Sequence, residues 1–141
     1  MERRLEDVRD VYAGTPSGGT DAALDNVLSF FEVIHHLKDH LGNDPASGVT
    51  KAEGDALINA SPTLQLCADL ANGSKHLALT STRTGDLSTT VTRNDATVLL
   101  GAGTVAHRFY VASAGIEYDV LDLAEDAVAK WTKFISDRGL I

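Results

Sequence analysis

A lysine occupies an unusual place in the longest helix that the sequence predicts. Winding the segment from Thr20 to Leu41 at about 100° per residue gathers its apolar side chains on one broad face. Lys38 projects into that face, and His35 lies at its border. Lys38 either lays its methylene stem along apolar surface with the ammonium in water, or is held in a polar niche by carboxylates of another helix. The first arrangement is structural, whereas the second would make Lys38 a site residue.

A second polar group shares one edge of the helix predicted from Pro62 to about His76. Asp69, Asn72 and His76 follow one another at spacings that return side chains to nearly the same side of a helix. Gly73, on the core side, is small enough to let another helix approach closely. We therefore expect two helices to meet through a polar cluster that contains the candidate catalytic residues His35, Lys38, Asp69, Asn72 and His76.

General acid–base catalysis is one use of these residues. His76 or His35 would exchange protons near neutral pH, and Asp69 would orient the imidazole. The sequence offers no nucleophile motif beside them, because Cys67 falls on the apolar side of its helix, where a cysteine behaves as a small buried hydrophobe. Capping is the alternative, since cations at Lys75 and His76 complement the helix dipole in the last turn.

Metal binding is another alternative. Glu32 and His35 reproduce half of the Glu-x-x-His spacing of di-iron bundles, and Asp69 or His76 would add ligands from a second helix. A complete site of that kind needs carboxylates from four helices and a second Glu-x-x-His, which the chain lacks. Residues 101–103 are glycine-rich but precede a strand rather than a helix, so they predict a hairpin loop and not a phosphate cradle. The sequence therefore predicts no bound metal and no cofactor.

Five helices are needed to position these residues. Capping signals, apolar spacing and terminating glycines or prolines define their limits. A helix from Asp122 should carry an apolar stripe of Ala124, Val128, Trp131 and Ile135 and end near Gly139. The other four are predicted at Glu2–Tyr12, from Thr20 or Asp21 to His40 or Leu41, from the Thr50–Glu53 capping box to about Asn59, and from Pro62, capped by Ser61, to about His76.

The period of the sequence changes from helical to alternating after the fourth helix. Runs rich in threonine and valine predict short strands, with turns at Asn94-Asp95 and Ser113-Ala114-Gly115. The expected strands are Leu77–Thr82, Leu87–Arg93, Thr97–Leu100, Val105–Ala112 and Ile116–Val120. The predicted fold class is therefore α+β: a helical bundle around a long central helix, with an antiparallel β-meander inserted before the C-terminal helix.

Composition limits the classes of protein that this chain can belong to. Its 141 residues suit a single domain spanning positions 1–141, and it has no apolar run long enough for a membrane span. A net charge of −8 disfavours nucleic acid as a partner and favours a protein partner or a homo-oligomer. One cysteine and a charged N-terminal segment make a cytoplasmic location the simplest expectation.

Three segments resemble small helical proteins encoded by bacteria and phages: FFEVIHHLKDHL, CADLANGSKHLAL and AVAKWTKFISDRGL. The helical arrangement is also similar to the HEPN superfamily, bundles that often cleave RNA in toxin and defence systems through an Arg followed five to seven positions later by His. The resemblance implies an RNA-cleaving enzyme. In this chain no arginine precedes a histidine at that distance, although Asn72 and His76 occupy a comparable place on a helix.

The function expected from the sequence is that of a small intracellular binding or regulatory module, because the candidate residues do not complete a catalytic constellation. Two alternatives stay open. One is a HEPN-like RNA-cleaving enzyme that uses the five candidate residues, and the other is a metal-binding helical protein.

Overall fold

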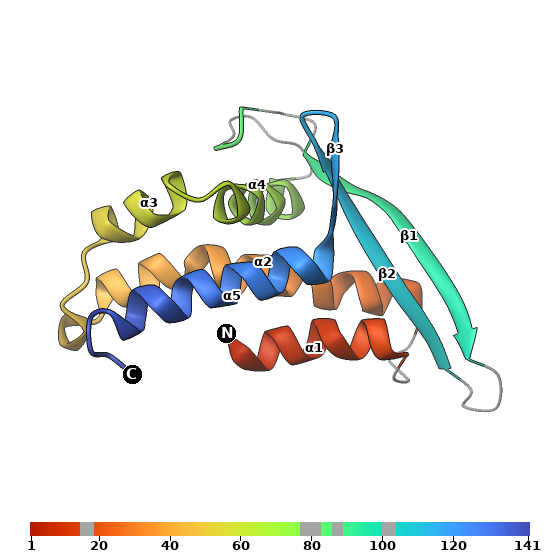
Figure 1. Ribbon diagram of the computed structural model, residues 1–141, viewed down its shortest axis with the longest axis horizontal. Helices are drawn as coiled ribbons and strands as arrows, with labels where there is room; N and C mark the ends of the chain where they lie inside the picture. Colours follow the sequence, from red (N-terminus) through yellow and green to blue (C-terminus); the bar gives the residue numbers. More distant parts are fainter. Residues whose placement is uncertain (15–18, 77–82, 86–88, 100–103) are drawn as a thin grey trace.

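A computed structural model of the chain describes residues 1–14, 19–76, 83–85, 89–99 and 104–141. The described residues form five α-helices, one short 3-10 helix and one antiparallel sheet of three strands in the order β1-β2-β3 (Figure 1). The elements are α1 (Glu2–Ala13), α2 (Thr20–Asn43), η1 (Pro45–Ser47), α3 (Lys51–Asn59), α4 (Pro62–His76), β1 (Thr90–Leu99), β2 (Thr104–Ser113), β3 (Ile116–Asp119) and α5 (Val120–Ser136). The predicted α+β class is confirmed, with the sheet before the last helix.

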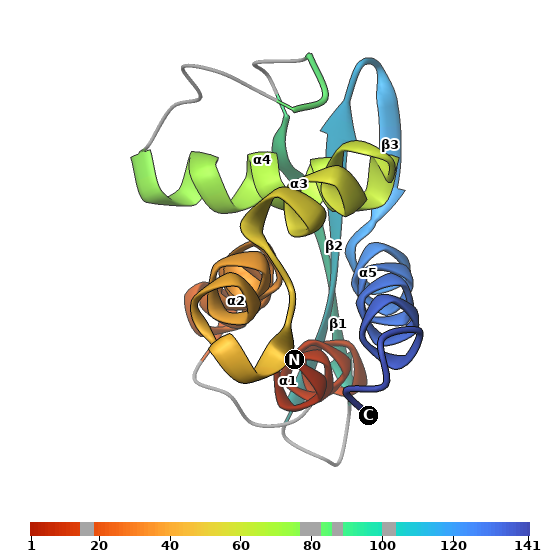
Figure 2. The same ribbon diagram turned by 90° about the vertical axis from the view of Figure 1, so that its left-hand side faces the viewer.

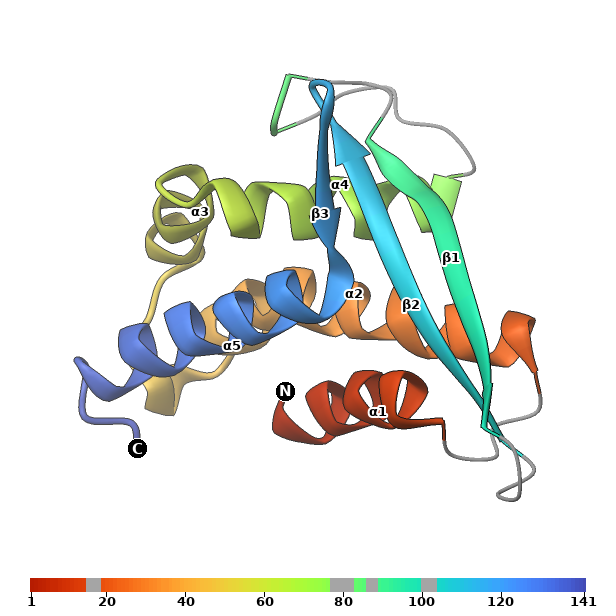
Figure 3. The same cartoon turned by 45° about the vertical axis from the view of Figure 1, so that its right-hand side comes forward.

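The sheet lies across one end of the helical layer (Figure 1). Seen at right angles, α2 and α5 point toward the viewer on either side of the strands, and α4 crosses above them (Figure 2). Alternate residues of β2, among them Phe109 and Val111, are buried against the helices. The other face of the sheet is crossed by no helix of the described part (Figure 3). The sheet therefore has one inner face and one open outer face.

Among the described residues, the core is one cluster of apolar side chains drawn from every α-helix and from β2. Phe30 and Phe31 of α2 pack edge to face, as do Trp131 and Phe134 of α5. The stripe predicted on α5 is confirmed, because Ala124, Val128 and Trp131 are buried and Ile135 packs against the core. None of the described helices is both long enough and apolar enough to cross a membrane.

Helix caps agree with the sequence in part. The Thr50–Glu53 capping box is present, and the Ser61 hydroxyl accepts a hydrogen bond from the Leu64 amide. The predicted cap of α2 is wrong, since Gly19 takes the N-cap position without a side-chain bond. The predicted start of α5 at Asp122 is also wrong: Asp119 caps this helix by accepting hydrogen bonds from the amides of residues 121 and 122. β3 therefore runs directly into α5.

The turn predicted at Asn94-Asp95 is wrong, because β1 continues through it. Asn94 and Asp95 lie opposite Phe109 and Arg108, and a bulge at Thr92 takes up the extra residue. The Ser113–Gly115 turn is confirmed, with positive φ at Ala114 and Gly115 as a tight hairpin requires. The predicted strand 77–82 and the glycine-rich loop 101–103 lie outside the described residues.

Candidate functional site

Lys38 lies where α3 approaches α2 closely. A Cβ added to Gly54 of α3 would stand 2.6 Å from the Lys38 Cβ, so the glycine permits the contact. The Lys38 side chain is only 14% exposed, and its Nζ lies 3.3 Å from an Asp39 oxygen and 3.5 Å from an Asp55 oxygen. The stem is thus covered by the helix contact, while the ammonium reaches two carboxylates.

Arg83 joins this group from the segment that follows α4. Its guanidinium lies 2.8 Å from Asp55 and donates a 2.7 Å hydrogen bond to the Asn59 side chain, both on α3. Asp55 is therefore shared by Lys38 and Arg83. Sequence reasoning missed Arg83 because it stands outside every predicted helix and strand, and no local spacing relates it to α2 or α3.

Asp69 connects α4 to the same segment and is fully buried. One carboxylate oxygen accepts the Arg83 backbone amide at 2.8 Å, and the other accepts the Thr84 amide at 3.0 Å and the Thr84 hydroxyl at 2.6 Å. These bonds occupy both oxygens. Asp69 is thus an anchor for residues 83 and 84 rather than a carboxylate open to a ligand.

His35 lies beside these charges on α2. Burial, together with the nearby charges of His36, Lys38 and Arg83, lowers the pKa of its imidazole to about 4. Its Nδ1 is buried and has no hydrogen-bond partner among the described residues. The imidazole is therefore neutral at pH 7.

The Lys38 cluster is defined as His35, Lys38, Asp55, Asp69 and Arg83. Lys38 of α2 pairs with Asp55 of α3, whereas Asp69 of α4 bonds residues 83 and 84, and no hydrogen bond or ion pair joins Lys38 to Asp69 among the described residues. The predicted polar contact between α2 and α4 is therefore indirect, through Asp55 and Arg83. Asn72 is half-buried on α4 and makes no side-chain hydrogen bond within the described residues, and the side chain of His76 lies outside them. No three His, Cys, Asp or Glu side chains come together as a metal site in the described part of the chain. The cluster links its charges to one another and to backbone groups.

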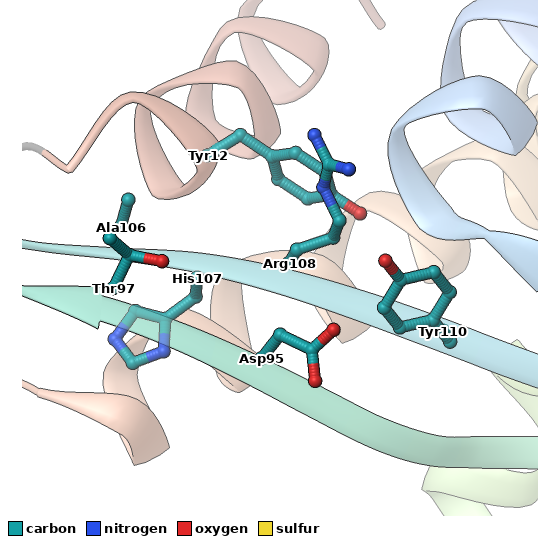
Figure 4. A pocket seen from close by; sticks show the side chains of 7 residues that line it. All are labelled: Tyr12, Asp95, Thr97, Ala106, His107, Arg108 and Tyr110. Atoms are coloured by element: carbon teal, nitrogen blue, oxygen red, sulfur yellow. The ribbon is translucent and has the colours of Figure 1, made fainter.

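A pocket of about 290 Å³ opens on the outer face of the sheet, far from the residues that the sequence selected. Two tyrosines and an arginine are prominent in its wall (Figure 4). Strand register places Asp95 opposite Arg108 and Thr97 opposite Ala106, so these four side chains share one face. We call this the outer-face pocket; it is lined by Tyr12, Asp95, Thr97, Ala106, His107, Arg108 and Tyr110.

Tyr12 closes one side of the outer-face pocket because β3 is too short to cover all of β2. Its hydroxyl accepts hydrogen bonds from the amides of Phe109 and Leu121 at 3.2 Å and lies 3.1 Å from an Asp119 oxygen. Burial raises the pKa of the Tyr12 hydroxyl well above its usual value, so the group stays protonated. The ring is thereby held rigidly beside β2.

Arginines and tyrosines alternate across the outer face. The Arg108 guanidinium lies 6.0 Å from the centre of the Tyr12 ring, and the Arg93 guanidinium lies 3.9 Å from the centre of the Tyr110 ring. A hydrogen bond with Tyr110 raises the pKa of Arg108. Carboxylates stand among them, since Arg93 pairs with Glu117 at 3.0 Å. The outer face is therefore charged in both signs and ordered.

No protein-family model, no curated protein and no solved structure matches this chain. Any proposal for its function therefore depends on the chemistry of the Lys38 cluster and of the outer-face pocket.

Proposed function

We propose that this protein is a non-enzymatic binding module that recognises another protein through the outer face of its sheet. The observation that carries the proposal is the outer-face pocket, where Tyr12, Arg108 and Tyr110 surround an open volume. Tyrosine and arginine are the residue types that dominate binding energy at protein interfaces. The Tyr12 hydroxyl accepts hydrogen bonds from the Phe109 and Leu121 amides, and the Tyr110 ring lies under the Arg93 guanidinium, so the two tyrosines lose little side-chain freedom on binding.

The charges of the outer face support a protein partner over a nucleic acid. Arg93 and Arg108 are accompanied by Asp95, Glu117 and Asp119, and the whole chain carries a net charge of −8. A phosphate backbone requires a surplus of cations, whereas a protein surface with both signs complements such a pattern. The proposal places the module inside the cell, because its one cysteine is buried and free.

The Lys38 cluster supports the non-enzymatic part of the proposal. Asp69 has both oxygens occupied by residues 83 and 84, so it does not orient an imidazole. Lys38 and Arg83 share Asp55. These charges neutralise one another and join three helices to one segment.

Site-specific photo-crosslinking tests the proposal. A benzophenone amino acid placed at Ala106, which lines the outer-face pocket, should crosslink a defined protein in an extract of the native host. The same group at Lys133 of α5, whose side chain is 76% exposed, is the matched control and should not capture that protein. Arg108→Ala should remove the crosslink from position 106. Equal capture at both positions, or capture that Arg108→Ala leaves unchanged, would contradict the proposal.

RNA cleavage is the second candidate function, favoured by one observation. Arg83 lies close enough to His35 to depress the pKa of the imidazole, which brings an arginine and a histidine together although no sequence motif does so. A neutral His35 at pH 7 has the protonation state of a general base. Single-stranded RNA incubated with the protein distinguishes the candidates: cleavage that His35→Gln abolishes and His40→Gln preserves would favour the enzyme.

A further inference from the structure

The outer edge of β1 is open to another strand. β1 stands at the rim of the sheet, and within the described residues no strand pairs with its other side (Figure 3). It is ten residues long, so it presents a long row of backbone N–H and C=O groups. The stretch from Thr92 to Thr97 is exposed except for the half-buried Asn94. An incoming strand therefore meets little obstruction from side chains of its own sheet.

The charged residues of β1 do not repel an incoming strand. Edge strands are often protected by charges that discourage pairing. In β1 the charges at Arg93 and Asp95 have opposite signs and lie 3.7 Å apart. The Arg93 guanidinium is further held over the Tyr110 ring, toward the middle of the sheet. The Arg93 and Asp95 side chains therefore place no net charge beside the backbone N–H and C=O groups of this edge.

An apolar notch of about 190 Å³ lies beside this edge. Leu24 and Leu28 of α2 are half-buried and stand one helical turn apart, so both face the notch, and Leu70 of α4 joins them. Thr89, Thr90 and Val91 complete the wall on the strand side, and Gly73 of α4 adds to the helical side. Figure 2 shows α2 on this side of the strands. A strand added to β1 would therefore turn every second side chain toward the leucines of α2.

The rim of the notch on α2 is acidic. Asp21 and Asp25 are exposed. On the helical wheel of α2 they lie about 60° from Leu24 and Leu28, on the side that faces away from the core. Basic side chains that flank an apolar one would complement this rim.

We propose that β1 binds an extended segment of a protein partner as an added strand, with an apolar side chain in the notch and Lys or Arg side chains beside Asp21 and Asp25. The inference rests on the proposed function and specifies its partner. Backbone hydrogen bonds along β1 supply affinity for any sequence, while the notch and the two carboxylates select among sequences.

A displayed library of random peptides, each about ten residues long as an added strand would be, is the probe. Selection on the intact protein should enrich peptides in which apolar residues alternate with Lys or Arg. Hydrogen exchange followed by NMR should then show that alternate amides of β1 gain protection in the complex. Asp21→Lys should weaken the selected peptide about 10-fold, because it reverses one rim charge. Glu2→Lys is the matched control, since Glu2 is the first-turn acid of α1 as Asp21 is of α2.

Three outcomes would overturn the inference: no enriched peptide, peptides whose binding leaves the β1 amides unprotected, or β1 amides already protected by a second copy of the chain without peptide. Leu28→Ser provides an independent variant, because it changes the notch without touching the rim. Failure of the peptides together with a specific crosslink at Ala106 would remove this inference and leave the proposed function standing. Loss of the crosslink would instead remove the proposed function itself.

Discussion

The Lys38 cluster and the outer face of the sheet both contain charged side chains, but these differ in burial and in the partners that they bind. In the cluster, Asp69 is fully buried and both of its oxygens are occupied by residues 83 and 84. On the outer face, the Arg108 side chain is 61% exposed, and its closest carboxylate is 3.7 Å away. Polar groups that hydrogen-bond to one another inside a fold stabilise it. Polar groups that face solvent can instead replace their bound water with contacts to a partner protein. Changes in the cluster should therefore alter stability, and changes on the outer face should alter binding.

Asp69→Ala should have the largest effect on stability. It leaves the amides of residues 83 and 84 without their acceptor in a buried place, which costs about 3 kcal/mol or more of the free energy of unfolding. Urea unfolding measures the loss. Asp25→Ala, an exposed carboxylate on α2, is the control and should change the free energy by less than about 0.5 kcal/mol. A loss below about 1 kcal/mol for Asp69→Ala would mean that the anchor is dispensable.

Gly54→Ala should be the next largest effect. The new Cβ would stand 2.6 Å from the Lys38 Cβ and 3.3 Å from its Cα, so α3 must move away from α2. We expect a loss of about 1 to 3 kcal/mol from overpacking, larger than the gain of about 1 kcal/mol in helix propensity. Ala56→Gly, at an exposed position of the same helix, measures how much helix propensity alone changes the free energy of unfolding. A more stable Gly54→Ala variant would show that the two helices are not in close contact.

His35 should make stability depend on pH. Its pKa is about 4 in the folded chain and about 6.5 when unfolded, so between these values only the unfolded state takes up the proton. Stability is therefore lost as the pH falls from about 6.5 to about 4, by roughly 1 to 2 kcal/mol after allowance for partial exposure. Comparing unfolding at pH 7 and pH 4.5 for wild type and His35→Gln isolates this contribution. His40→Gln, at an exposed position, should lose as much stability between pH 7 and pH 4.5 as the wild type does.

Lys38→Met should have the smallest effect within the cluster. Methionine fills the volume of the covered stem, and Asp55 keeps its 2.8 Å pair with Arg83. The free energy of unfolding should fall by less than about 1 kcal/mol. A loss near that of Asp69→Ala, measured by the same urea unfolding, would assign Lys38 an essential structural charge.

The sequence predicted the helices well because their signals are local. Thr50 and Glu53 form the capping box that their spacing indicates, and the stripe on α5 faces the core as its period requires. The strands were predicted less well, since Asn94 and Asp95 favour a turn by their own preferences but are held in β1 by pairing with β2. The turn preferences of single residues give no information about this long-range strand pairing.

Helical spacing selected Lys38 and Asp69, but it could not predict that Asp55 and Arg83 stand between them. Lys38 and Asp69 were found because both lie on regular helices, whereas Arg83 comes from a segment whose sequence has neither a helical nor an alternating hydrophobic pattern. The outer-face pocket escaped sequence reasoning altogether. Tyr12 and Arg108 are 96 positions apart and meet only because β3 leaves part of β2 for α1 to cover. Alternating exposed side chains on β2 were the one local signal available.

The most direct test of this account compares Arg108→Ala with Lys38→Met in both properties at once. Retention of the protein that crosslinks to position 106 should fall at least about 10-fold for Arg108→Ala, with a free energy of unfolding within about 0.5 kcal/mol of wild type. Lys38→Met should retain that protein as wild type does. If Lys38→Met loses the partner while Arg108→Ala keeps it, the functional surface lies at the Lys38 cluster and the proposed division of roles is wrong.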